Sequence, residues 1–203
     1  MDKNKLRFRQ VHLDFHTSEY CRNVGADFAE EQFLRALKVG HVDSITVFAM
    51  CHHGWTYYPT ETDAAHPQLK TDLLGRMLKV GKQANINMPV YITVRWNDKA
   101  SREHPEWVIR NTDGSMMGPK HTHPHNPKTT GPSWYMLCLN NPYLEEVVIP
   151  ITKEVLERYN PSGFFFDITN EIECTCSWCK ETMIEHGLDL SSKSDRVLCS
   201  QIV

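Results

Sequence analysis

The chain alternates between short apolar runs and longer segments in which apolar residues recur every three or four positions. Runs rich in β-branched and aromatic residues predict strands over residues 8–15, 44–50, 89–96 and 163–168. Helical periodicity predicts helices over residues 26–39, 69–84, 143–159 and 176–186. Strands that alternate with helices form βαβ units in a parallel sheet, so the pattern indicates an α/β fold of about four βα units.

Composition and charge narrow the range of partners. The 203 residues, 40% of them hydrophobic, suffice for one core, and a net charge of -3 gives no electrostatic basis for binding nucleic acid or an anionic membrane. The charged N-terminal segment lacks the apolar stretch of a signal peptide, and no window approaches the roughly 18 apolar residues of a membrane span. We therefore expect a cytoplasmic protein with neither nucleic acid nor a membrane as a partner.

Two carboxylates follow the last apolar run. Ligands of parallel α/β folds bind at the C-terminal ends of the strands, which is where Asp167 and Glu171 fall. Either could serve in the carboxylate pair of a glycosidase, so we take Asp167 and Glu171 as the catalytic candidates. The structural alternative is that Asp167 caps the following turn and that Glu171 is merely solvated.

The other three strands also carry polar and aromatic residues where a ligand could bind. Imidazoles bond sugar hydroxyls, and aromatic faces pack against the C–H surface of a pyranose. We therefore expect one shared cleft and predict as its substrate-binding residues His12, Asp14, His16, His52, His53, Trp55, Arg95 and Asn97. In the first strand the two-residue spacing places all three polar residues on one face, where a metal triad or an internal hydrogen-bond network are the alternatives.

The cysteines indicate a metal site. Seven cysteines with uneven spacing do not resemble a secreted disulfide framework. Three soft ligands lie on one tight Cys-x-Cys-x2-Cys turn made of Cys174, Cys176 and Cys179. Tetrahedral zinc needs a fourth ligand, for which we favour Cys138 over Cys21 and Cys51. We expect structural zinc and no organic cofactor, with buried or redox-active thiols as the alternative.

A long segment over residues 114–133 is rich in proline, glycine and histidine, as lids and disordered excursions of α/β domains are. His121, His123 and His125 alternate within it and could bind metal. In so polar a segment, solvated side chains are the favoured interpretation.

Several of these motifs, taken in order, resemble the N-terminal part of the hypothetical glycosyl hydrolase 6 family. The family contains TIM-barrel proteins related to α-L-fucosidases and to family 42 β-galactosidases. The motifs that carry the resemblance are residues 11–16, 52–55, 91–96, 105–107 and 165–167. The resemblance, which runs from about His12 to His186, implies the N-terminal half of a (β/α)8 TIM barrel.

The length of the chain then has a consequence. A complete barrel takes about 250 residues, and half a barrel leaves two unpaired parallel edges, which proteins normally avoid. We therefore treat residues 1–203 as a single partial TIM-barrel domain of a glycoside hydrolase, truncated at the C-terminus. Such a fragment would hold only half of the catalytic pair.

The resemblance also assigns roles to particular residues. Asp167 matches the strand-four aspartate that is the nucleophile of fucosidase-like barrels, and Glu171 resembles the acid/base of family 42. Glu171 lies only three residues before Cys174, where family 42 leaves a longer gap, so Asp167 ranks first. The family 42 zinc site, a Cys-x-Cys-x2-Cys cluster joined by an earlier cysteine, is similar to the turn at 174–179 together with Cys138.

We therefore predict a glycoside hydrolase that cleaves a terminal bond of an oligosaccharide or glycoside with retention, and in which zinc is structural. One alternative is a non-catalytic carbohydrate-binding or assembly half-barrel, completed by a second chain as a homo-oligomer. The other alternative is a metal-dependent hydrolase with ligands from the first two strands, namely His12, Asp14, His16, His52 and His53.

Overall fold

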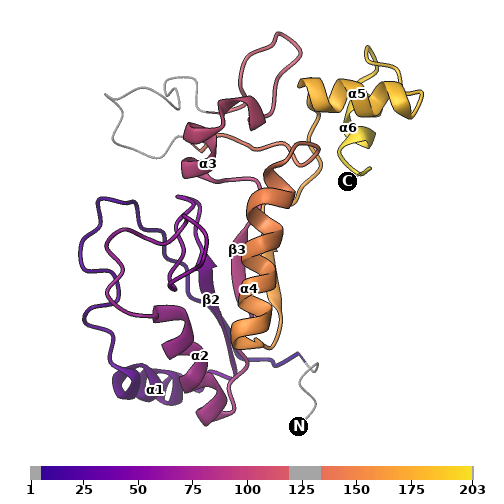
Figure 1. Cartoon of the computed structure of the whole chain (residues 1–203). Coiled ribbons are helices and arrows are strands. Elements are labelled where there is room, and N and C mark those ends of the chain that lie inside the picture. The colour runs from indigo at the N-terminus through magenta and orange to yellow at the C-terminus, as the bar shows by residue number, and fades with distance from the viewer. Residues whose placement is uncertain (1–5, 119–133, 203) are drawn as a thin grey trace. The chain divides into compact units, whose positions relative to one another are not determined.

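The computed structural model describes residues 6–118 and 134–202 (Figure 1). The three histidines predicted as possible ligands in the long loop lie outside the described residues. The sheet strands, in chain order, are β1 (Gln10–His12), β2 (Ser44–Met50), β3 (Val90–Thr93) and β4 (Phe164–Asp167). The α-helices are α1 (Glu30–Val39), α2 (Leu73–Ala84), α3 (Asp98–Glu103), α4 (Ile149–Tyr159), α5 (Ser177–Glu185) and α6 (Lys193–Cys199).

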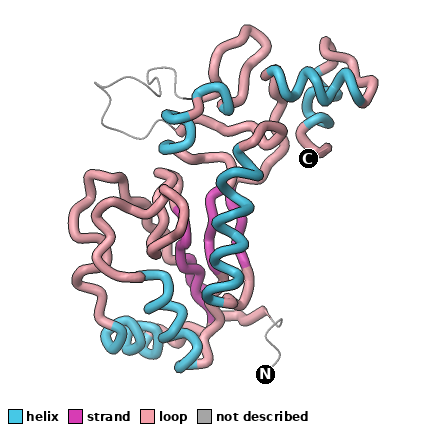
Figure 2. Tube along the Cα trace, in the orientation of Figure 1, coloured by secondary structure: helices cyan, strands magenta, loops and turns pink. Residues whose placement is uncertain are grey.

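The strands form one sheet in the order β1-β2-β3-β4, shown in magenta in Figure 2. The first three pair in parallel, with Val11 opposite Ile45 in β1 and β2. Between β3 and β4 the Val90 N–H donates to the Gly163 carbonyl at 2.9 Å, and four residues further along each strand Val94 donates to Asp167 at 2.9 Å. Because the partners advance together, this pair is parallel as well. Sequential parallel strands with intervening helices confirm the prediction of the N-terminal half of a (β/α)8 barrel.

The chain divides into two compact units. Unit 1 contains residues 1–51, 55–92 and 151–166, and unit 2 contains residues 52–54, 93–150 and 167–203. Unit 1 therefore holds most of the sheet with α1 and α2, whereas unit 2 holds the segments that follow β2, β3 and β4, with α3, α5 and α6. The single partial domain expected from the sequence stays a prediction. Within the described residues, every helix is too short or too polar to cross a bilayer.

The core of unit 1 is built on β2, whose seven residues are all buried. Phe48 of β2 lies opposite Tyr91 of β3, and the two rings stack at 3.8 Å with an interplanar angle of 7°. Helix α2 begins where the Asp72 carboxylate accepts the Gly75 N–H at 2.8 Å, and it ends at Asn85 in the left-handed conformation. Burial of each large apolar side chain stabilises such a core by about 1.5–3 kcal/mol.

Four elements differ from the sequence prediction, among them two helices that were not expected, α3 and α6. Strand β1 stops at His12, and the chain beyond it packs the Phe15 ring on Phe48 at 5.0 Å instead of continuing the ladder. The helix predicted over 143–159 exists, but its first part, Leu144–Val148, is a π-helix. Pro150 has no N–H to donate to the carbonyl four residues earlier, which disfavours regular α-helical bonding there.

Candidate functional site

Unit 2 places a histidine, a carboxylate and two indoles together where the strands end. We call His52, Trp96, Trp134 and Asp167 the strand-end cluster. His52 Nε2 lies 3.5 Å from Asp167 Oδ2. The His52 ring meets Trp96 edge-on at 5.0 Å and Trp134 edge-on at 5.3 Å. The imidazole is thus walled by apolar surface while one nitrogen faces the carboxylate, an arrangement suited to a sugar.

The turn after β2 positions this histidine through the backbone. The His52 carbonyl accepts the Asp98 N–H at 2.9 Å, and the His53 carbonyl accepts the Lys99 N–H at 3.1 Å. Gly54 follows at a φ of +84°, and a Cβ on it would lie 2.1 Å from Asn97 Oδ1. Only glycine fits both the left-handed conformation and this close approach.

Asn97 itself is 2% exposed and caps α3, because its Oδ1 accepts the Ala100 N–H at 2.9 Å. The sequence predicts that Asn97 binds substrate. The structure shows it beside the turn, where it fixes the start of the helix that holds the His52 and His53 carbonyls. A cap of this kind contributes roughly 1 kcal/mol to stability.

Asp167 is held at the end of β4 with part of its carboxylate accessible. Its Oδ1 accepts the N–H of the next residue, Ile168, at 2.9 Å, which orients the carboxylate but does not cap the following turn. Its Oδ2 faces His52, and the side chain is 33% exposed. The backbone therefore orients the Asp167 carboxylate while part of it stays accessible.

Two members of this region have unusual backbones. Ile168 has a φ of 57° and Trp134 a φ of 46°, both in the left-handed region. For a β-branched residue such as Ile168 that conformation is rare, and each such residue costs about 1–3 kcal/mol. Strain of this kind collects at functional sites, which supports a functional interpretation of the strand-end cluster.

Glu171, the second catalytic candidate, is exposed. Within the part of the chain that the structure describes, no hydrogen bond or ion pair of Glu171 is found. Its catalytic role, like that of Asp167, stays a prediction.

Unit 1 holds the polar residues of the first strand. His12 and His16 both pack edge-on against Phe48, at 5.5 and 5.3 Å, although β1 ends at His12 and the two-residue alternation of a strand does not extend to His16. Asp14 Oδ1 lies 2.8 Å from His16 Nε2. These contacts form a local network of ring packing and one imidazole–carboxylate contact, in which the Asp14 side chain is 63% exposed, so the role of these residues stays a prediction.

Trp55 also belongs to unit 1, and its indole Nε1 donates to Glu19 at 3.4 Å. The structure thus brings His52, His53, Asn97 and Asp167 together in unit 2 and His12, Asp14 and His16 together in unit 1. A single cleft lined by both groups stays a prediction. Trp134 was missed by the sequence analysis, although a tryptophan beside a polar loop could have suggested it.

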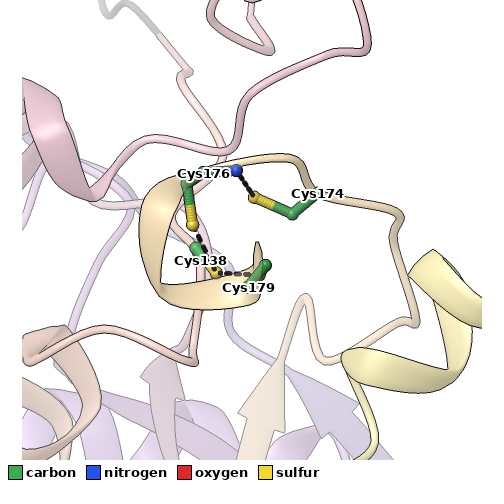
Figure 3. Close-up of side chains that lie close together, drawn as sticks. All are labelled: Cys138, Cys174, Cys176 and Cys179. Atoms are coloured by element: carbon green, nitrogen blue, oxygen red, sulfur yellow. Dashed lines mark hydrogen bonds between the residues drawn. The ribbon is translucent and has the colours of Figure 1, made fainter. Parts of the chain in front are cut away.

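The four predicted zinc ligands meet in unit 2. The sulfur atoms of Cys138, Cys174, Cys176 and Cys179 all lie within 4.8 Å of one another, and all four residues are buried (Figure 3). Cys138 Sγ is 3.3 Å from Cys179 Sγ and 3.8 Å from Cys176 Sγ. Tetrahedral zinc with bonds of about 2.3 Å would separate its sulfur ligands by roughly 3.8 Å. The four thiols therefore fit a metal ion of this kind.

Hydrogen bonds divide the four thiols, because those from neighbouring sulfurs lower the pKa of Cys174 and Cys176 and raise the pKa of Cys138 and Cys179. Bonds from Cys138, followed by those from the other two thiols, hold the pKa of Cys174 well below its usual range. Backbone N–H groups of Cys176 and Arg110 also donate to the Cys174 sulfur, at 3.4 and 3.5 Å. Metals bind the thiolate, so the support for a metal here is the convergence of the four sulfur atoms together with the ionisation favoured at Cys174 and Cys176. Elsewhere in the described residues, no group of three or more metal-binding side chains meets, which leaves the first-strand residues without support as a metal triad.

Arg95 lies near the cysteine cluster. It is 2% exposed, and its Nη1 donates to the carbonyl of Leu137, the neighbour of Cys138, at 3.2 Å. Burial lowers the pKa of Arg95, whereas the thiols of the cluster, led by Cys138, act to raise it. No carboxylate among the described residues forms an ion pair with it. Since a buried cation requires a counter-charge, thiolates are its natural partners. Its predicted contact with substrate stays untested.

Comparisons with known proteins agree with this geometry. The model of the hypothetical glycosyl hydrolase 6 family matches residues 29–168. The structure of α-L-fucosidase isoenzyme 2 from Paenibacillus thiaminolyticus is similar at 38% identity and a TM-score of 0.85, over 97% of this chain and 29% of that one. The chain thus spans less than a third of the length of that fucosidase. No curated protein matches the chain.

Two more distant structures share the fold alone. A hypothetical protein from Ruminiclostridium thermocellum aligns at 13% identity and a TM-score of 0.60, over 95% of this chain and 88% of that one. An α-L-fucosidase from Vibrio sp. aligns at 14% identity and a TM-score of 0.50, over 86% and 24%. The family resemblance expected from the sequence is confirmed, and because the family model spans most of the chain, this protein belongs to the hypothetical glycosyl hydrolase 6 family.

Proposed function

We propose that this chain carries the nucleophile of a retaining glycoside hydrolase that releases a terminal sugar, with an α-L-fucoside as the first substrate to test. The observation that carries the proposal is Asp167 at the end of β4, partly accessible and 3.5 Å from His52. The similarity to an α-L-fucosidase over nearly the whole chain supports the choice of sugar.

The proposed chemistry uses the two oxygens of the Asp167 carboxylate. One Asp167 oxygen attacks the anomeric carbon, an ester to the sugar forms, and the bond to the leaving oxygen breaks as an acid protonates that oxygen. Water then hydrolyses the ester and returns the free carboxylate. The Ile168 N–H and the His52 imidazole orient the two oxygens, while Trp96 and Trp134 offer apolar surface to the sugar ring.

The acid/base is the second part of the proposal. Glu171 is the candidate within this sequence, and it is exposed. Since this chain spans 29% of the fucosidase, a carboxylate on another segment of a longer barrel is the other source. The two carboxyl groups of a retaining pair lie about 5–5.5 Å apart. The carboxylate found at this distance from Asp167 is therefore the acid/base.

The test is turnover and trapping in the longest natural form of the protein. Asp167→Asn should lower kcat with a nitrophenyl α-L-fucoside by about 10⁴-fold or more, as losses of covalent nucleophiles do. A 2-fluoro glycosyl fluoride should label the peptide that contains Asp167. Glu171→Gln is the matched control for labelling, because it removes a nearby carboxylate but leaves Asp167. Label on Glu171, or normal turnover by Asp167→Asn, would exclude Asp167 as the nucleophile.

We further propose that the cysteine cluster holds structural zinc. Four thiolates close the coordination shell, which leaves no position for a substrate or a reactive water. The ion would tie the turn at 174–179 to the segment at Cys138 and supply rigidity rather than chemistry. One zinc per chain by elemental analysis, lost in Cys138→Ser, supports this; a metal-free native protein with four titratable thiols contradicts it.

A second candidate function is a carbohydrate-binding or assembly half-barrel completed by another chain. It is favoured by β4, the last strand of the sheet order, where Phe165 and Phe166 are 45% and 44% exposed. Proteins rarely leave such a strand edge bare. A dimer that binds fucose without hydrolysing fucosides would favour this function, and a monomer that turns them over would exclude it.

A further inference from the structure

Unit 2 contains a groove that the proposed glycosidase site and the cysteine cluster do not explain. Its volume is about 800 Å³, and its walls come from the segment after η1 (Pro105–Trp107), the start of α5 and the stretch before α6. Its charged lining consists of three cations, Arg110, Lys180 and Arg196, and one carboxylate, Glu106, and Cys176 of the cysteine cluster also lines it. An excess of positive side chains in a concave site attracts anions and concentrates the field inside it.

The two guanidinium groups are fixed in place by the protein. Arg110 Nη2 donates to the Pro105 carbonyl at 2.9 Å, and Arg196 Nη1 donates to the Leu190 carbonyl at 2.9 Å. The Arg196 side chain is only 11% exposed and is also paired with Glu173 at 3.1 Å. Anchored guanidinium groups lose little further freedom when they bind an oxyanion, which favours binding.

The single carboxylate of the lining, Glu106, does not neutralise Arg110 or Lys180. Glu106 lies 3.1 Å from His104 through its Oε1, so its carboxylate is already engaged. Neither Arg110 nor Lys180 forms an ion pair with a carboxylate of the described residues. Arg110 and Lys180 are therefore available to a ligand. Arg196 can contribute only those N–H groups that do not bond to Glu173.

The first turn of α5 adds donors to the same wall. Ser177, Trp178 and Lys180 line the groove, and the N-cap residue Cys176 makes no side-chain cap bond. The first N–H groups of a helix have no intrahelical partner, and the helix dipole favours negative charge there. The Trp178 indole provides a face on which the body of a ligand can pack.

We propose that this groove binds an oxyanionic small molecule, held by its sulfate, phosphate or carboxylate group between Arg110 and Lys180 at the start of α5. A groove of this volume takes more than a bare ion, so the anionic group anchors a larger polar ligand whose remainder lies along Trp178. The proposal is independent of glycoside hydrolysis, and the metal-loaded state of the cysteines is kept in its test because Cys176 lines the groove.

The test is a titration of the metal-loaded protein with inorganic sulfate, inorganic phosphate and glucuronate, followed by the amide and indole NMR signals of Ser177 and Trp178. Glucose is the neutral counterpart, and chloride at matched ionic strength controls for screening. We expect a saturable shift with at least one of the three oxyanions and none with glucose or chloride. Sulfate and phosphate without glucuronate would identify a tetrahedral group, and glucuronate alone a carboxylate.

The variants Lys180→Gln and Arg110→Gln should each weaken this binding by about tenfold, the loss expected for one charge-assisted hydrogen bond. Lys193→Gln is the matched control, since Lys193 is an exposed cation of unit 2 outside the groove lining. Unchanged zinc content and circular dichroism establish that the variants fold. Shifts that stay linear with concentration, or equal losses in Lys193→Gln and Lys180→Gln, would overturn the proposal.

Discussion

Replacement of Gly54 by alanine tests how the turn after β2 is built. A Cβ on Gly54 would lie 2.1 Å from Asn97 Oδ1 and 2.9 Å from the Lys99 Cβ, at a φ of +84°. The left-handed conformation alone costs an alanine roughly 1–2 kcal/mol. Asn97 would also have to move, and the cap bond to Ala100 that would be lost contributes roughly 1 kcal/mol. We therefore expect Gly54→Ala to lower the free energy of unfolding by about 3 kcal/mol.

Gly187→Ala provides the matched comparison for this effect. Gly187 also has a positive φ, +66°, but nothing lies within 4 Å of the Cβ position. Its alanine variant should therefore show only the conformational cost of roughly 1–2 kcal/mol. Urea unfolding of both variants, followed by circular dichroism, gives the two values on one scale. Equal losses in the two variants would refute the reasoning, because the contact with Asn97 would then contribute nothing.

The double variant Gly54→Ala with Asn97→Ala isolates the contact itself. Truncation of Asn97 removes the clash together with the cap. In a protein that already carries Gly54→Ala, the added Asn97→Ala substitution should therefore lower the free energy of unfolding only a little further. We expect a coupling energy of about 1 kcal/mol between the two sites. Additive losses would mean that the Asn97 amide moves aside without cost.

Three further predictions concern the cysteine cluster and a buried histidine. Cys138→Ser should abolish stoichiometric zinc binding and lower stability by several kcal/mol, as measured by elemental analysis and urea unfolding, because three remaining thiols leave the shell open. Arg95→Gln should weaken zinc affinity about tenfold in competition with a chelating dye, since the thiolates lose their buried counter-charge, whereas exposed Lys193→Gln should not. His66 is 3% exposed, and burial lowers its pKa in the folded protein. The free energy of unfolding therefore has its full contribution from neutral His66 above pH 6.5, which is about the pKa of histidine in the unfolded chain, and loses it as the pH falls below that value. His66→Gln should flatten that decline in urea midpoints between pH 7 and 5, and an unchanged slope would contradict it.

The sequence predicts best those elements that are buried on both faces. Every residue of β2 is inside the core, so its apolar run was recognisable with the bounds that the structure has. Strand β1 was predicted too long, because Phe15 is as apolar as a strand residue but packs its ring on Phe48 and Tyr57 from a loop. Periodicity does not distinguish these two ways of burying an aromatic ring.

The candidate sites show the same division. The Cys-x-Cys-x2-Cys turn is visible in the sequence because its ligands are neighbours, but Cys138 joins it through tertiary folding, so the sequence could favour it over Cys21 and Cys51 without a spacing that fixes it. The contacts of Trp134 with His52 and His53 depend on where a long loop returns, which no local pattern encodes. The burial of Arg95 against Leu137 is likewise a property of the packed structure.

The place of the cysteines along the chain gives the metal a topological role. Cys138 precedes α4 and β4, and the other three ligands follow them, so an ion on the cluster would close one loop that contains both α4 and β4. Closure of a loop of this size restricts the unfolded chain by about 3–4 kcal/mol if it acts as a disulfide does. The same closure would keep the two ends of this loop together whenever α4 and β4 detach from the rest of the chain. It would thereby raise the chance that β4 pairs again in its native register. The four thiols, with their metal, would thus hold the two ends of this loop together while the barrel folds.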